Sequence, residues 1–340
     1  MYTSSVIKQS ATLIIPIFKK FFFRMLRVFL VVACFAYSLW EVDITRLKAV
    51  FNNYSFGLLI VAQLYVLVAI LPSAFRIRLL SQKRASLIES IEAVFLGLGV
   101  NNMLPIKLGE VAKAIFLQKK VRIPLGEGLN IVFWERFSDL NALLILVGIS
   151  VAFFMKKSPL FLVLFGIVAG IWCFLLIHKQ GLKIIEKVLR VMNLGRMQKL
   201  INEFFLHIKD RLQARFLLIL AVHTIVVWIF LVSVPYVILW KVSGLNLSFG
   251  QILMVVIISS LGMAVPSLPG AIGVYEASIV VSLTYLGVAK EEALANAIIL
   301  HLMQYIPTTI GALLIMIKTK LVIKSFRVPL PGISNGVVNE

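Results

Sequence analysis

The residues best suited to binding or catalysis are ionisable side chains inside long apolar runs. Glu135, Arg136 and Asp139 lie in one such run, at roughly residues 129–154. A charge at the centre of a membrane helix costs about 2.5–3.5 kcal/mol on insertion scales, so such groups normally face partners or a cavity. Glu135 and Asp139 share a helical face, and Arg136 can pair with Asp139 three residues on. The pattern therefore predicts a functional charge site here, or a structural ion pair that locks this helix to a neighbour.

Arg136 is the only base that the pattern places inside a span. Its planar guanidinium can hold a phosphate through two parallel hydrogen bonds. Lys107, Glu110 and Lys113 follow a break in another apolar stretch, where the free N–H groups of a half-helix attract anions. Both lysines would strengthen that attraction, while Glu110 can pair with one of them or with Arg136. Asn102 is expected to be polar lining at the same break.

A second polar group lies toward the C-terminus. Glu276 is the only acid of its stretch and is a candidate counter-charge for a cation or a proton carrier, although a first-turn acid also stabilises a helix dipole. His301 and Gln304 lie one turn apart in the last apolar run. A buried histidine of this kind is more commonly a hydrogen-bonded structural residue than a proton relay, and the sequence leaves both roles open.

The elements that hold these groups belong to a membrane protein. The chain has 340 residues, of which 60% are hydrophobic and 14% charged, and its mean hydropathy is +0.99. Soluble domains have about 45–50% apolar and about 25% charged residues, so soluble, fibrous and disordered classes are excluded. The net charge of +19 is expected to set topology and contact anionic lipids rather than nucleic acid. No nucleotide-binding or metal-binding motif is present, so no cofactor is expected.

An all-α fold with about six spanning helices is predicted, because a bilayer core of about 30 Å needs about 20 apolar residues. The six runs are at roughly 25–41, 56–75, 129–154, 159–178, 216–240 and 293–317. Two further stretches, 88–117 and 250–288, are interrupted by Asn, Pro and Gly.

Charge asymmetry predicts the orientation of these segments. Bases before the first run place the N-terminus in the cytoplasm, and Arg76 and its neighbours fall in a cytoplasmic loop. The cluster Lys119–Arg122 also belongs in the cytoplasm, so 88–117 should enter the membrane and return as a re-entrant hairpin. By the same rule 250–288 enters from outside and the C-terminus is cytoplasmic. If every stretch crossed once, the Lys119–Arg122 cluster would lie outside.

The two interrupted stretches also predict an inverted repeat. Pro105-x-x-x-Gly109 and Pro269-x-x-x-Gly273 have the same spacing, and each lies between two full spans. Paired interrupted segments in corresponding halves are the best sequence pointer to a transporter binding site near the midplane. Ordinary kinked spanning helices are the alternative. The expected division is a cytoplasmic segment 1–24, a membrane domain 25–320 and a cytoplasmic tail 321–340. Within the membrane domain, halves 25–178 and 215–320 flank a link, 179–214, that is either an amphipathic helix on the inner leaflet or a solvated linker.

Three motifs carry a resemblance to a known family. They read Asn102-Met-Leu-Pro-Ile-Lys-Leu-Gly-Glu110, Glu135-Arg-Phe-Ser-Asp139 and Pro269-Gly-Ala-Ile-Gly-Val-Tyr-Glu276. Together they resemble the flippase-like transmembrane domain of lysylphosphatidylglycerol synthases and their stand-alone relatives, over roughly residues 20–320. Lys107 stands where the family often has Arg, and Tyr275 where a basic residue is frequent. The resemblance implies translocation of a lipid between leaflets, and not its synthesis, which a separate soluble domain performs in two-domain members.

The predicted function is therefore non-enzymatic movement of a lipid or lipid-linked glycan intermediate across the cytoplasmic membrane. The head group would pass through a polar midplane cavity between the hairpin tips. Its anionic form would be held by Arg136, Lys107 and Lys113, and the balancing or cation-binding acids would be Glu110, Glu135, Asp139 and Glu276. Two alternatives stay open: a membrane transferase acting on a lipid phosphate with Glu135 or Asp139 as base, and a scaffold for envelope-biosynthesis proteins.

Overall fold

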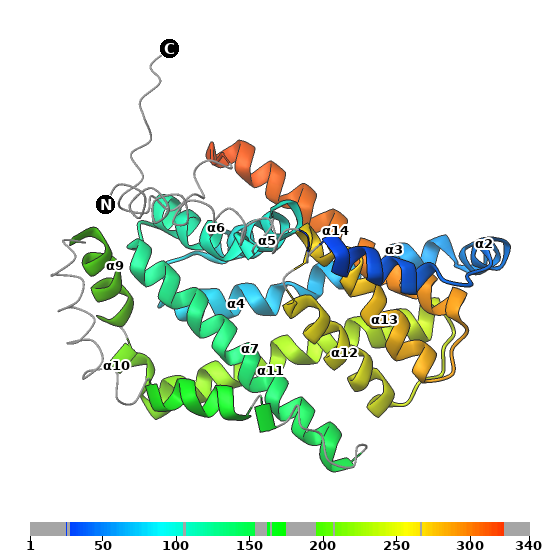
Figure 1. Cartoon of the computed structure of the whole chain (residues 1–340). Coiled ribbons are helices and arrows are strands. Elements are labelled where there is room, and N and C mark those ends of the chain that lie inside the picture. The colour runs from blue at the N-terminus through cyan, green and yellow to red at the C-terminus, as the bar shows by residue number, and fades with distance from the viewer. Residues whose placement is uncertain are drawn as a thin grey trace, which may run out of the picture.

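The fold is known from a computed structural model of the chain. It describes residues 25, 28–104, 107–153, 162–163, 165–174, 195–206, 208–265 and 267–322. Every regular element among these residues is a helix, which confirms the all-α prediction (Figure 1). Pro105, the predicted N-terminal segment 1–24 and the tail beyond residue 322 lie outside the described residues.

The first helices that the structure describes form a bent pair. Helix Val28–Leu39 and α2 (Ile44–Asn53) meet at an angle of 80°. The Asp43 carboxylate caps α2 by accepting the backbone N–H of Thr45 at 2.7 Å. Two nearly continuous helices follow, α3 (Phe56–Ala69) and α4 (Leu71–Leu80), which together form one apolar rod of 25 residues.

The first interrupted stretch forms two antiparallel helices. They are α5 (Leu87–Met103) and α6 (Gly109–Phe116), which continues into the π-helical turn η2 (Leu117–Val121). Gly97 lies beside Lys113 and Asn101 beside Gly109, so the chain turns back between the two helices. A Cβ at Gly109 would come within 1.9 Å of the Gly97 carbonyl oxygen, so only glycine permits this close approach.

The next part of the chain holds a long helix and a small helical flank. Helix α7 (Leu125–Phe153) is followed by the short apolar helix Phe165–Phe174, and then by α9 (Gly195–Leu206) and α10 (Ile208–Arg211). Helix α9 packs against α7, where the Asn130 amide donates to the Phe204 carbonyl oxygen at 2.8 Å. This part of the predicted link therefore docks on the protein. Residues 179–194, where an amphipathic helix was expected, lie outside the described residues.

The second half of the chain repeats the order of elements. Helix α11 (Ala214–Val237) with η3 (Ile238–Val242) is a full-length rod, as α3 and α4 are. The second interrupted stretch forms α12 (Phe249–Ala264), the 3-10 turn η4 (Pro269–Ala271) and α13 (Val274–Tyr285), and the last helix is α14 (Lys290–Thr319). Helices α12 and α13 pack together, as α5 and α6 do. The order rod, helix pair and long helix thus occurs twice, while the opposed orientation of the two units and their re-entry into the membrane stay predictions.

Three described helices are long and apolar enough to cross a membrane. They are Phe56–Leu80, Ala214–Val242 and Lys290–Thr319, and the bent pair at residues 28–53 makes a fourth if it acts as one span. These helices cover four of the six predicted runs. Helix α7 has the necessary length, 29 residues, but its ionisable residues lower its apolar character. Of the sixth run, 159–178, only part lies within the described residues.

Helix α14 holds the two helix pairs together. It packs along α5 over its C-terminal half and against α13 nearer its start (Figure 1). The contact with α5 is close because Gly99 faces the Thr308 carbonyl oxygen and the Ala312 methyl group, where a Cβ would leave only 2.3 Å. Small residues at a helix crossing allow this approach, which membrane helices use for association.

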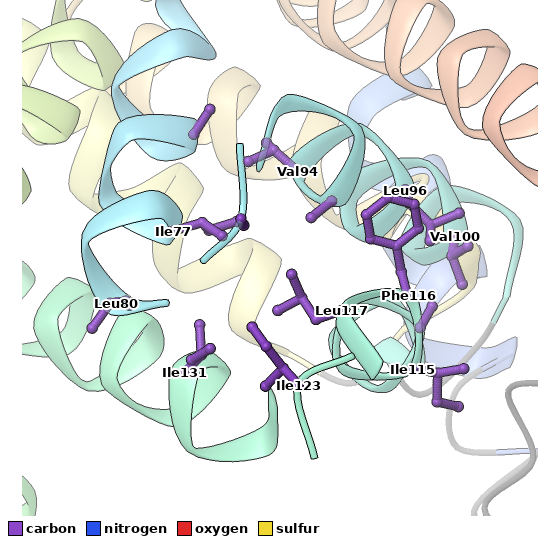
Figure 2. Close-up of a cluster of buried hydrophobic side chains, with 14 of the residues drawn as sticks. Ile77, Leu80, Val94, Leu96, Val100, Ile115, Phe116, Leu117, Ile123 and Ile131 are labelled. Carbon is purple, nitrogen blue, oxygen red and sulfur yellow. The ribbon is translucent and has the colours of Figure 1, made fainter. Parts of the chain in front are cut away.

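The apolar interior consists of two clusters of buried side chains, one beside each helix pair. The first joins α4, α5, α6 and α7 through Ile77, Leu96, Phe116 and Ile131, all fully buried (Figure 2). The second joins α11, α12, α13 and α14. Large apolar side chains such as Phe56, Leu218 and Ile317 are instead at least 70% exposed on the three rods, as expected for surfaces that face lipid.

Candidate functional site

The most concentrated polar site is a charge cluster between α4, α6 and α7. Its inner layer is Arg76, Lys113 and Glu135, whose side chains are at most 4% exposed. The Lys113 ammonium lies 2.7 Å from one Glu135 carboxylate oxygen, and an Arg76 guanidinium nitrogen lies 3.7 Å from the other. Each buried charge therefore has an opposite charge beside it, which is the condition for keeping ions in a low-dielectric interior.

The outer layer of the charge cluster is Glu110, Arg136 and Asp139. Arg136 lies 2.8 Å from Glu110 and 3.3 Å from Asp139, which joins α7 to α6 and confirms the predicted pairing three residues along the helix. Asp139 also accepts from both terminal nitrogens of Arg76, at 2.6 and 3.2 Å. The Arg136 side chain is 47% exposed, against about a fifth for Glu110 and Asp139. The cluster is thus closed at Arg76 and open at Arg136.

Arg76 corrects the sequence interpretation. The sequence pattern predicts a cytoplasmic loop here, because Arg78, Lys83 and Arg84 follow Arg76, and it leaves Arg136 as the only base within a span. The Arg76 residue is instead 1% exposed, inside α4. The contact between Arg76 and Asp139 joins residues 63 positions apart, so no local sequence pattern predicts it.

Lys107 lies at the open side of the charge cluster. It precedes α6, its backbone φ is +52°, and its side chain is exposed. In the chain it stands three residues before Glu110 of the charge cluster. Counting Lys107, four cations (with Arg76, Lys113 and Arg136) meet three carboxylates, which leaves one positive charge on the exposed side.

The first helix pair is fixed to α14 by Asn102. Its amide nitrogen lies 3.0–3.2 Å from three acceptors on α14, the Tyr305 carbonyl and the hydroxyls of Thr308 and Thr309. In return the Tyr305 hydroxyl donates to the Asn102 carbonyl oxygen at 3.0 Å. The neighbouring Asn101 carboxamide oxygen accepts the Gly109 N–H at 2.8 Å and closes the turn between α5 and α6.

The second helix pair is fixed to the same helix by Glu276 and His301. One Glu276 oxygen accepts the Gly273 N–H at 2.7 Å, as a first-turn acid can, and the other lies 2.6 Å from His301 Nδ1. His301 Nε2 lies 3.0 Å from the Gly270 carbonyl oxygen. The Tyr305 ring then packs beneath Gly270, so Tyr305 contacts both helix pairs.

The predicted site residues therefore fall into two places. The charge cluster contains Glu110, Lys113, Glu135, Arg136 and Asp139, with Lys107 at its edge. The contacts of Asn102, Glu276, His301 and Tyr305, which we name the α14 seam, run between the two helix pairs. Gln304 is half-buried beside the seam, and its side chain makes no hydrogen bond within the described part of the chain. Among the described residues, no three His, Cys, Asp or Glu side chains come together as a metal site would require.

No residue of the charge cluster lines either of two pockets found in the described part of the chain. One is an apolar groove of about 410 Å³ between α3, α4 and α11. Its lining includes Val68, Leu71, Phe75, Val222, Val226 and Phe230. The groove shares two helices with residues that contact the charge cluster. Phe75 of the groove precedes Arg76 in α4, and the Trp228 indole of α11 donates to Asp139 at 3.3 Å. The other pocket, about 440 Å³, lies on α9.

Comparison with known proteins decides the family. Residues 24–312 match the family described as lysylphosphatidylglycerol synthase TM region. The chain belongs to this family. A UPF0104 membrane protein of Methanocaldococcus jannaschii is 26% identical over 230 residues, which are 66% of this chain and 96% of the relative. No solved structure matches the chain significantly. The family and the apolar helices together make this a multi-pass membrane protein.

Proposed function

We propose that this protein moves a lipid with an anionic head group between the two leaflets of the cytoplasmic membrane. The observation that carries the proposal is the half-exposed guanidinium of Arg136 beside the buried charges of Arg76, Lys113 and Glu135. The transferase hypothesis is less favoured, because Glu135 and Asp139 are already paired with Lys113 and Arg76 and are poorly placed to act as bases. We also propose that both termini lie in the cytoplasm. Envelope-biosynthesis proteins are the proposed partners.

The head group would bind at the open side of the charge cluster. A phosphate can take the place of the Glu110 carboxylate on Arg136, because Glu110 also lies 3.7 Å from Lys113 and keeps a counter-charge when displaced. Lys107, exposed and three residues before Glu110, is the second cation that we assign to this position. The buried pairs of Arg76 and Lys113 hold the acids of α7 in place, so Arg136 and Lys107 are the residues we assign to the lipid phosphate.

The lipid tail would stay in the bilayer beside the same helices. The groove between α3, α4 and α11 is apolar and has a volume of about 410 Å³, so it is the place that we propose for lipid hydrocarbon. Phe75 lines the groove and is followed in α4 by Arg76 of the charge cluster, so we propose that one lipid places its tail along the groove and its phosphate at Arg136. This arrangement separates a polar path from an apolar one, which lipid translocation requires because only the head group needs shielding from hydrocarbon.

The two helix pairs supply the moving parts in this proposal. Broken helices at membrane depth are tolerated where they are buried in protein or line a watery cavity, and in inverted-repeat transporters they frame the substrate site. Both breaks here contact the middle of α14. Opening one contact at a time would expose the head-group path first to one side and then to the other.

The test is a leaflet-exposure assay in vesicles that contain the purified protein. Fluorescent phosphatidylglycerol is the probe, and dithionite quenching reports the fraction in the outer leaflet over time. We expect Arg136→Ala to slow movement at least tenfold and Arg136→Lys to be intermediate, since Lys keeps the charge without the bidentate geometry. Arg46→Ala is the matched control, because Arg46 is exposed on α2 and its ion pair within the described residues is with the nearby Asp43.

Three outcomes would count against the proposal. Equal rates for Arg136→Ala and the wild type would remove Arg136 from the path. Equal rates for fluorescent phosphatidylglycerol and phosphatidylcholine, in a protein that is active, would remove the anionic preference. A third test labels single cysteines at Asn102 and Ser267 from each side of the membrane at neutral and alkaline pH, and protection of both from both sides at both pH values would favour a passive scaffold.

A further inference from the structure

His301 lies between two hydrogen-bond acceptors. Its Nδ1 is 2.6 Å from a Glu276 carboxylate oxygen, and its Nε2 is 3.0 Å from the Gly270 carbonyl oxygen. A neutral imidazole carries one N–H and presents a lone pair on its other nitrogen. A neutral histidine beside an ionised Glu276 would therefore leave one of these short contacts between two lone pairs.

One added proton on the pair removes the contact between two lone pairs. If Glu276 is ionised, both imidazole nitrogens must donate, and His301 is an imidazolium. If His301 is neutral, Nε2–H donates to Gly270 and a protonated Glu276 donates to Nδ1. Both arrangements hold one proton more than a carboxylate with a neutral imidazole. The contacts thus require an added proton, whichever of the two groups carries it.

Within the part of the chain that the structure describes, no other cation pairs with Glu276. Glu276 and His301 have side chains 13% and 12% exposed, and within the described residues no Lys or Arg forms an ion pair with Glu276. The titratable groups that face the pair are Tyr275 of α13 and Tyr305 of α14, whose rings lie 4.8 and 5.5 Å from the imidazole, and Cys34 of helix Val28–Leu39. None of these is cationic. Burial disfavours an unpaired charge, so the pair is best satisfied when it holds one added proton, whereas Glu135 has Lys113 and Arg76 as counter-charges.

We propose that the Glu276–His301 pair is a proton-binding site, and that its proton fastens the second helix pair to α14. With the proton present, His301 joins Glu276 to Gly270 in the turn η4. When the proton leaves to water, one of the two contacts is lost and the turn is released from α14. The proton site stands on these contacts alone. Its use as the coupling ion of lipid movement rests on the proposed function.

The first test measures the proton directly. The other three histidines, His178, His207 and His223, are replaced by Gln, and the ¹⁵N spectrum of His301 is recorded in lipid vesicles between pH 5 and 10. The protonated-carboxyl infrared band that disappears in Glu276→Gln is followed in parallel. We expect either two N–H nitrogens or a protonated Glu276 at neutral pH, with loss of that signal at alkaline pH. A neutral imidazole beside an ionised carboxylate at pH 7 would overturn the proposal.

The second test measures the release of the turn. In protein whose Cys34 and Cys173 are replaced by Ser, a cysteine at the buried Ser267 is labelled with a water-soluble maleimide. Rates are divided by those of a cysteine at the exposed Asn246, which corrects for the pH dependence of the thiol reaction. We expect the corrected rate at residue 267 to rise at least fivefold as the pair loses its proton. A rate that stays constant would overturn the proposal that this proton fastens the turn to α14.

Glu276→Gln provides the matched control. The Gln amide can donate to Nδ1 without a titrating proton, so Nε2–H keeps its bond to Gly270. The variant should therefore fold and keep residue 267 protected at every pH, while a pH response equal to that of the wild type would overturn the assignment to Glu276. Neither measurement uses lipid movement, so a failure of the transport assay and a failure of the proton site are separate results.

Discussion

The Tyr305 hydroxyl donates a hydrogen bond to the carbonyl oxygen of Asn102, across 203 residues of sequence. Its ring at the same time packs beneath Gly270 of the other helix pair. One side chain of α14 thus contacts both breaks in the apolar stretches. Movement of either break relative to α14 must change a contact of Tyr305, and this gives the two halves a physical route for coupling.

The Asn102 side chain is predicted to stabilise this junction. Asn102→Ala removes the amide that lies within hydrogen-bond distance of three acceptors on α14, while Asn246→Ala alters an exposed loop residue. We expect Asn102→Ala to lower the free energy of unfolding by about 1–3 kcal/mol, because buried acceptors lose their partner. Thermal unfolding of the two variants in the same detergent measures the difference, and equal midpoints would show that the amide adds nothing.

The close approach of α5 and α6 is predicted to depend on Gly109. A methyl group there would meet the Gly97 carbonyl and the Asn101 side chain, whereas one at Gly170 meets nothing within 4 Å. We expect Gly109→Ala to separate the two helices and destabilise the protein by more than about 2 kcal/mol, as overpacking does. Gly170→Ala should be neutral or slightly stabilising, because alanine favours a helix. The comparison uses thermal unfolding, and a tolerated Gly109→Ala would contradict the packing described for this pair.

Sequence patterns were sufficient for the membrane class and for the charge sites of α7. Hydropathy predicts the three long rods because each needs a continuous apolar surface to face lipid. The pairing of Arg136 with Asp139 is also local, since residues three apart share a helical face. Glu110 was expected to pair with Arg136 or a lysine, and it contacts both Arg136 and Lys113.

Long-range contacts could not be predicted in this way. Arg76 resembles the loop bases that follow it, and only the packing of α4 against α7 shows that it is buried beside Asp139. His301 and Glu276 lie 25 residues apart on different helices, and neither neighbourhood indicates the partner. Charge counts treat bases as solvated topology signals, so they miss a base that the fold takes into its interior.

The pair of Lys113 and Glu135 is predicted to be strongly coupled. Their side chains are 3% and 4% exposed and 2.7 Å apart, so each single replacement leaves a buried charge without its closest partner. We expect Lys113→Met and Glu135→Gln each to cost about 3–5 kcal/mol of unfolding free energy, and the double variant to cost less than their sum. A double-mutant cycle on thermal unfolding measures the coupling, and additive effects would contradict a direct interaction.

Arg76 and Arg136 are predicted to separate stability from activity. Both contact Asp139, but the Arg76 side chain is 2% exposed and Arg136 is 47% exposed. Removing a buried partner is costly, so Arg76→Ala should lower the free energy of unfolding by about 3–5 kcal/mol. A half-exposed ion pair contributes about 1 kcal/mol or less, so Arg136→Ala should unfold almost as the wild type does. If lipid movement then slows in Arg136→Ala while its unfolding midpoint is unchanged, the loss belongs to head-group binding. An equal loss of stability in both variants would instead make Arg136 a structural residue and remove its assignment to the lipid phosphate.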